Sequence, residues 1–291
     1  MALKFKQVDV FTATPFKGNP VAVVFGADGL DTAQMQRIAH WTNLSETTFL
    51  LKPTQEGATH RVRIFTPQSE LAFAGHPTLG TAHAAIEGGV VTPQGGKLVQ
   101  ECKMGLVGLT VMGEGAQRTI TLDLPQTRTR VLDDAEIAEM EAVLGAPVDR
   151  AAPPRVIDVG PKWITALMKD AAAVRAARPD LVRMPAFEKK VGGTGVVIFG
   201  RHPDGGPAAI EVRAFAPSDG IAEDPVCGSG NGCVAVFIRD AGLSDSIGRT
   251  YTASQGFCVG RDGRIAVDIA TDGGVKLGGH CVTVVDGSIA A

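Results

Sequence analysis

Several patterns that would place a chain in a broad protein class are missing from these 291 residues. The net charge of −3 comes with both signs interspersed, so there is no basic stripe of the kind that binds nucleic acid or an anionic membrane surface. No apolar run approaches the roughly 18 to 20 residues of a membrane span, and the N-terminal residues lack the apolar segment of a signal peptide. We therefore expect a soluble, cytoplasmic protein that binds a small molecule, and neither nucleic acid nor membrane.

Cysteine and glycine spacings exclude further classes. The five cysteines are odd in number and form no CxxC pair, which argues against a disulfide framework and against a structural zinc site. The histidines show no metal-ligand spacing either. Glycines in residues 228–232 follow a GxGxG pattern, not the GxGxxG of a dinucleotide-binding turn. We expect reduced thiols and no structural zinc site, and the interpretation as a dinucleotide-binding turn is weak.

Short β-branched runs alternate with helical stretches along the chain. Residues 31–42 predict a helix with Asp31 as its N-cap and with Ile38 and Trp41 facing inward. Residues 78–87 predict a second helix that is rich in alanine and almost without charge. A helix that is apolar on every side should be buried.

An internal duplication organises the chain. Residues 63–67 are echoed by residues 213–217, and residues 75–77 fall opposite residues 228–230. A chain of this length fits two domains of about 150 residues, each a curved sheet around one buried helix. We expect the first domain over residues 1–117, completed by about 279–291, and the second over 118–278, with the proline-rich residues 151–155 as the rival boundary.

Residues 223–232 bring several potentially reactive side chains together in one turn. They hold two carboxylates, a thiol, a hydroxyl and several glycines directly before an apolar helical run, which predicts an anion-binding turn with acid and base groups attached. If equivalent turns of the two domains meet across a cleft, one offers Glu46 and His76 and the other Asp224, Cys227 and Ser229. A carboxylate enclosed there would be desolvated, which raises its pKa toward the value that proton transfer requires.

Simpler interpretations stand beside these. Glu46 could be a solvated surface acid, since a lone glutamate usually is. Asp224 before a proline could form an ordinary Asx-turn, and Ser229 could be a helix cap. His76, between a glycine and a proline, could be a turn histidine bonded to backbone.

With these motifs assembled, the chain resembles the PhzF family of phenazine-biosynthesis isomerases, relatives of diaminopimelate epimerase. The stretches that carry the resemblance are Val8-Asp9-Val10-Phe11, Gly18-Asn19-Pro20, Asn43-Leu44-Ser45-Glu46-Thr47, Phe73-Ala74-Gly75-His76-Pro77-Thr78, Glu223-Asp224-Pro225-Val226 and Ser254-Gln255-Gly256. Together they run across nearly the whole chain.

The resemblance implies an α+β fold of two pseudo-symmetric diaminopimelate epimerase-like domains, each a barrel-like, mostly antiparallel sheet around a central helix. It also implies a homodimer and a reaction without cofactor or metal. In the family, the glutamate that matches Glu46 moves a proton between carbons of a dihydro-hydroxyanthranilate, so the expected reaction is similar to that of trans-2,3-dihydro-3-hydroxyanthranilate isomerase. The matching catalytic residues are Glu46, His76 and Asp224, and the substrate-binding residues are Gly75, Gly228, Ser229 and Asn19.

Two other functions remain open. Diaminopimelate epimerases and proline racemases use one cysteine from each domain, but the duplication sets Cys227 opposite Ala74. An epimerase could still use Cys227 with Glu46 or His76 as the opposing base, if the helix end behind the thiol lowers its pKa. The other alternative is a non-enzymatic ligand- or partner-binding protein with the same fold.

Overall fold

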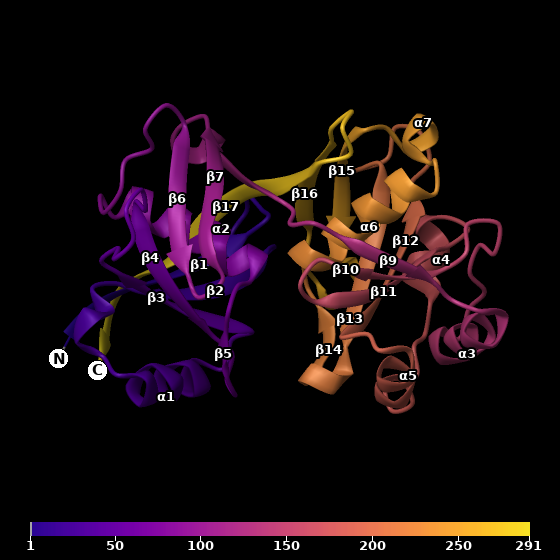
Figure 1. Ribbon diagram of the computed structural model, residues 1–291, viewed down its shortest axis with the longest axis horizontal. Helices are drawn as coiled ribbons and strands as arrows, with labels where there is room; N and C mark the ends of the chain where they lie inside the picture. Colours follow the sequence, from indigo (N-terminus) through magenta and orange to yellow (C-terminus); the bar gives the residue numbers. More distant parts are fainter. Residues whose placement is uncertain (1) are drawn as a thin grey trace. The chain divides into compact units, whose positions relative to one another are not determined.

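The computed structural model describes residues 2–291 (Figure 1). The chain forms two compact units, one made of Met1–Asp123 with Gly278–Ala291 and the other of Leu124–Leu277. The strand at Thr119–Asp123, which the sequence analysis gave to the second domain, lies in the first unit because it pairs with strands of that unit. None of the helices within residues 2–291 is long and apolar enough to cross a membrane.

The first unit is a closed barrel of eight strands. In order around the barrel they are β1 (Ala2–Val10), β2 (Asn19–Val24), β3 (Glu46–Leu51), β4 (His60–Phe65), β6 (Lys97–Cys102), β7 (Gly105–Met112), β8 (Thr119–Asp123) and β17 (Val275–Ala290). Neighbours are antiparallel except for β2 with β3 and β4 with β6. The short β5 (Glu70–Leu71) is added to β4. The last strand, β17, pairs with both β1 and β8 and so closes the barrel.

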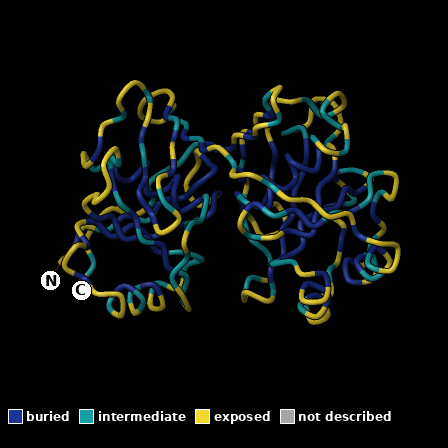
Figure 2. Tube along the Cα trace, viewed as in Figure 1, coloured by how far each residue is buried: buried dark blue, intermediate teal, exposed yellow. Residues whose placement is uncertain are grey.

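Helix α2 (Gly75–Glu87) lies inside this barrel, and its path is almost entirely buried in Figure 2. Its small residues let the strands approach closely: a Cβ added at Gly80 would come within 2.4 Å of Val21 and 2.9 Å of Val10. The prediction of a buried helix over residues 78–87 is confirmed.

Helix α1 (Thr32–Thr42) lies outside the barrel and has Asp31 as its N-cap, as predicted; the structure adds a capping box between Asp31 and Gln34. The prediction that Trp41 faces inward is wrong, because its side chain is 77 % exposed. Met35 and Ala39 form the buried stripe, and Trp41 lies about 200° around the helix from Ala39.

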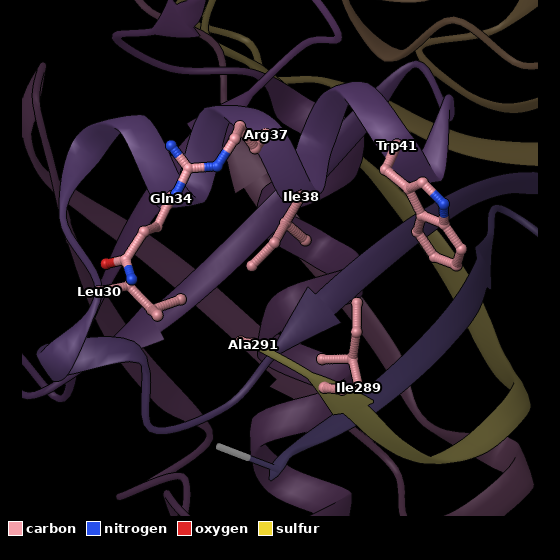
Figure 3. A pocket seen from close by; sticks show the side chains of 8 residues that line it. Leu30, Gln34, Arg37, Ile38, Trp41, Ile289 and Ala291 are labelled. Atoms are coloured by element: carbon pink, nitrogen blue, oxygen red, sulfur yellow. The ribbon is translucent and has the colours of Figure 1, made fainter.

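Trp41 instead borders a groove of about 470 Å³ in the first unit (Figure 3). The lining side chains include Leu30, Gln34, Arg37, Ile38, Trp41 and Ile289. None of the expected site residues is among them.

The second unit repeats the strand order of the first. Its strands pair in the sequence β9 (Arg128–Val131), β10 (Arg155–Asp158), β11 (Lys162–Leu167), β12 (Gly195–Arg201), β13 (Ile210–Ala216), β15 (Thr250–Gln255) and β16 (Gly263–Ile269), with β14 (Ile221–Asp224) added to β13. Parallel neighbours again occur at equivalent places, β11 with β12 and β13 with β15.

Helix α6 (Gly228–Asp240) is the buried counterpart of α2 and has the same length, 13 residues. Three further helices cover the sheet, α3 (Asp134–Leu144), α4 (Ala171–Ala176) and α5 (Met184–Val191), and α7 (Ser244–Ile247) follows α6. Single 3₁₀ turns lie at Ala27–Gly29, Gly115–Gln117, Pro217–Asp219 and Phe257–Val259. A core cluster that includes Met140, Phe187 and Ile198 joins α3 and α5 to the sheet.

Each unit contains an equivalent arginine–glutamate ion pair, in addition to the strand topology that the two have in common. Arg63 makes a bidentate bond to Glu70 at 2.7 and 2.9 Å, and Arg213 makes one to Glu223 at 3.0 and 2.8 Å. Each guanidinium also lies over the phenylalanine two residues later, at 5.1 and 4.9 Å from the ring centre. This match in side-chain detail confirms the duplication read from residues 63–67 and 213–217.

Candidate active site

In the first unit, Glu46 and His76 are brought together at the opening of α2. Asn43 ends α1 with a φ of 54°, a left-handed conformation that asparagine tolerates, and the chain turns there into β3. Glu46 is the first residue of β3, and His76 lies in the first turn of α2. Their side chains meet with 3.2 Å between His76 Nε2 and Glu46 Oε2. The Glu46 side chain is 14 % exposed, so Glu46 is not a solvated surface acid.

The His76 ring is neutral near pH 7, because burial lowers its pKa to about 3 against the opposing effect of a hydrogen bond to the Pro20 carbonyl. Since Nε2 faces Glu46, we assign the bond with Pro20 to Nδ1–H. Nε2 then carries a lone pair, and a hydrogen bond between it and Glu46 requires a proton on the carboxyl group. Among the described residues, His76 Nε2 has no hydrogen-bond partner in this structure, and at 3.2 Å it is placed to accept one from Glu46 once that carboxyl group has gained a proton.

In the second unit, Asp224 ends β14 just before α6. Its Oδ1 accepts a hydrogen bond from the Val226 N–H at 3.0 Å, so the expected Asx-turn is present. The residue is only partly exposed, and burial raises its pKa to about 6 even though bonds from Val226 and Cys227 oppose the shift. Asp224 can therefore gain or lose a proton near neutral pH.

Cys227 caps α6, which corrects two expectations. Its Sγ accepts a hydrogen bond from the Gly230 N–H at 3.2 Å, so the cap is Cys227 and not Ser229. Burial, and next the nearby Asp224, raise the thiol pKa well above its usual value. The helix end does not lower that pKa because desolvation outweighs it, and the thiol stays protonated.

Ser229 has a fixed partner that sequence reasoning missed. The indole Nε1–H of Trp163, in β11, donates to Ser229 Oγ at 2.9 Å, and the Cys227 thiol lies 3.6 Å from the same oxygen. An oxygen that already accepts from an indole has its own proton to donate elsewhere. Nothing in the sequence around Trp163 signalled this contact, which joins residues far apart in the chain.

Gln255, the last residue of β15, also holds the turn. Its side-chain oxygen accepts from the Cys227 N–H at 3.1 Å and from Asn231 Nδ2 at 2.8 Å, while its Nε2 donates to the Asp224 carbonyl at 2.8 Å. Residues 254–256 were recognisable as a motif, but their sequence did not reveal this role.

The remaining expected residues lie beside these groups. Gly75 and Gly228 open helices α2 and α6, where the first N–H groups have no intrahelical partner. A Cβ added at Gly75 would meet nothing nearer than Leu122 at 4.0 Å, so the protein's own packing does not demand glycine there. Asn19 is fully buried at the start of β2, next to Pro20, whose carbonyl bonds His76.

Metal ligands do not gather in the part of the chain that the structure describes. Over residues 2–291, no group of three His, Cys, Asp or Glu side chains is placed to hold a metal ion.

The family model for phenazine biosynthesis-like proteins, PhzC-PhzF, matches residues 8–287. The chain belongs to the PhzF family. It is 35 % identical over 256 residues to trans-2,3-dihydro-3-hydroxyanthranilate isomerase of Pseudomonas fluorescens, with 87 % of this chain and 86 % of the relative covered. It is 41 % identical to "Antisense-enhancing sequence 1" of Schizosaccharomyces pombe, with 97 % of each chain covered.

The solved structure of a "Predicted Epimerase" from Pseudomonas aeruginosa is similar to this PhzF-family chain with a TM-score of 0.83 and 28 % identity, covering 99 % of both. The predictions of a PhzF-family chain, of its α+β fold and of an isomerase are confirmed by these likenesses. Within the family fold, the N-caps of the two central helices are Ala74 and Cys227, so the thiol has an alanine as its counterpart.

Proposed function

We propose that this isomerase moves a proton within a small, carboxylate-bearing metabolite, cyclic or derived from an amino acid, by acid/base catalysis without a cofactor. The observation that carries the proposal is the contact between Glu46 and the neutral, buried ring of His76 at 3.2 Å. The relative named trans-2,3-dihydro-3-hydroxyanthranilate isomerase supports a substrate of this kind.

Glu46 is the proton carrier in this proposal. Its carboxylate takes a proton from a carbon next to an activating group, the electron pair of the C–H bond is delocalised into the substrate, and Glu46 returns the proton to another carbon on the same face. His76 Nε2 accepts a hydrogen bond from the protonated carboxyl group and so holds the proton between the two transfers. The protein is unchanged at the end of the cycle.

The turn of the second unit carries groups that can bind and polarise a carboxylate-bearing substrate. Asp224, which titrates near neutral pH, exchanges a proton with an amino or hydroxyl group of the substrate. The N–H groups of Gly228 and Ser229, at the positive end of α6, bind the carboxylate. Ser229 O–H donates to the same anion, because its oxygen already accepts from Trp163.

The test is solvent-deuterium incorporation into trans-2,3-dihydro-3-hydroxyanthranilate and a panel of amino-acid-derived carboxylates, followed by NMR and mass spectrometry. We expect Glu46→Gln to reduce exchange by a factor on the order of 10² to 10⁴, the usual contribution of a general base. Glu114→Gln, at an exposed position, is the matched control and should exchange like the parent protein. A Glu46→Gln variant that exchanges as fast as the parent would remove Glu46 from the reaction.

The same assay separates the isomerase from an epimerase. Loss of exchange in Cys227→Ser, together with inversion at a stereocentre, would assign the reaction to the thiol. We also propose, from the resemblance to the family, that the protein works as a homodimer in the cytoplasm. Light scattering of the purified protein tests the dimer, and a monomer at micromolar concentration would refute it.

A further inference from the structure

Gln255 uses both ends of its side-chain amide on the turn that carries Asp224. The side chain is 1 % exposed, and its three hydrogen bonds, of 2.8 to 3.1 Å, all go to residues 224–231. A buried amide with both of its ends occupied by one turn has a single orientation.

The three bonds reach three different parts of that turn. One goes to the Asp224 carbonyl at the end of β14, one to the backbone N–H of Cys227 at the N-cap, and one to Asn231 in the first turn of α6. Asn231 in turn donates to the Cys227 carbonyl at 2.9 Å. One side chain thus connects the end of a strand, a helix cap and the helix itself.

The chain after Gln255 follows the turn closely. Gly256 has a φ of 101°, and a Cβ at this position would lie 2.6 Å from the Pro225 carbonyl oxygen. Only glycine allows both the conformation and the approach. The backbone directly after β15 is therefore fixed against the same turn that the Gln255 side chain holds.

We propose that Gln255 is a positioning residue, which holds the Asp224 side chain in its desolvated place at the opening of α6. The proposal rests on the proposed role of Asp224 in proton transfer, but Gln255 itself acts only through the turn.

Two other groups that face Asp224 affect its pKa in opposite directions in the parent protein. Glu223, its neighbour on β14, raises the pKa of Asp224, but it is held by Arg213 of β13 at 2.8 Å. The thiol of Cys227, on the cap of α6, donates a hydrogen bond that lowers it. A substitution at Gln255 leaves Glu223, Arg213 and Cys227 unaltered. A change in the pKa of Asp224 therefore reports a change in the position of its side chain.

The experiment follows the Asp224 carboxyl group by carbon-13 NMR in the protein without ligand, with Asp224→Asn to assign the signal. Gln255→Met keeps the volume and removes all three bonds, so the turn opens to water and the pKa of Asp224 falls by about one unit or more toward its ordinary value. Gln255→Glu keeps the acceptor for Cys227 N–H and Asn231, so the pKa stays at or above that of the parent. Asn231→Ala removes one of the bonds and shifts the pKa in the same direction as Gln255→Met, by less.

Val267→Ala is the control for lost stability, because Val267 is buried on β16 opposite Tyr251 and makes no bond to the turn. It should lower the melting temperature and leave the titration of Asp224 where it is. The proposal is overturned if Gln255→Met and Asn231→Ala titrate like the parent, or if Val267→Ala shifts Asp224 as far as they do. Failure of the exchange assay would refute the proposed function without changing this measurement.

Discussion

Replacing Asp224 by asparagine should stabilise the protein at neutral pH and have no such effect in acid. Burial raises the pKa of Asp224 from 3.8 to about 6. A carboxyl group with a raised pKa in the folded state stabilises the fold below its unfolded-state pKa, and this stabilisation is lost as the pH rises through the folded-state value. Above about pH 6 the folded protein therefore holds a costly charge that asparagine does not have.

The size of the effect follows from the shift. One pKa unit corresponds to about 1.4 kcal/mol, so the full shift is equivalent to about 3 kcal/mol. Asp224 is partly exposed, and solvent screening reduces this figure. We expect the free energy of unfolding of Asp224→Asn, relative to the parent, to increase by about 1 to 2 kcal/mol between about pH 3 and pH 8.

The positions of the two tryptophans allow the unfolding of the second unit, which contains Asp224, to be measured by fluorescence. Trp41 lies in α1 of the first unit and Trp163 in β11 of the second, so a Trp41→Phe background leaves Trp163 fluorescence to report on the unit that contains Asp224. Denaturant unfolding is followed across the pH range, with the exposed Asp204→Asn as the matched control. An advantage of Asp224→Asn that is independent of pH, or largest in acid, would refute the reasoning.

Three further substitutions test other contacts. Trp163→Phe removes the donor to Ser229 Oγ, and we expect KM to rise by a factor of about 5, the equivalent of about 1 kcal/mol, with no additional loss in a Ser229→Ala background. An equal additional loss there would contradict the contact. Arg213→Met leaves the carboxylate of Glu223 largely buried without its ion pair and should destabilise the second unit by about 3 kcal/mol, whereas adding Glu223→Gln should restore part of the loss in thermal unfolding. Cys227→Ser should keep the rate of deuterium exchange within a factor of about 3, because a serine hydroxyl can replace the protonated thiol as the helix cap. A loss by a factor of about 10² or more would show that the thiol takes part in the reaction.

Local patterns explain why much of the fold could be predicted. The N-cap at Asp31, the uncharged helix after Gly75 and the arginine–phenylalanine repeats are each encoded within a few residues. The duplication then aligned the openings of α2 and α6, and the resemblance to the family singled out Glu46, His76 and Asp224 among the residues near them.

The errors and omissions concern contacts between distant residues. Trp41 has the hydrophobicity of a core residue, but the helix turns it away from the buried stripe. Trp163 and Gln255 reach the turn from other strands, and no spacing in the sequence connects them with Ser229 or Asp224. The state of Cys227 depends on desolvation, which is a property of the folded environment and not of the helix that follows the thiol.

The closure of the first barrel by β17 has a consequence for the order in which the protein matures on the ribosome. The second unit is one continuous segment, Leu124–Leu277, and all of its strands and helices emerge before β17 is complete. The first unit starts earlier but keeps β1 and β8 as open edges until residues 278–290 arrive. The unit that is translated first is therefore finished last, and during synthesis it is the part of the chain that needs protection from edge-to-edge association.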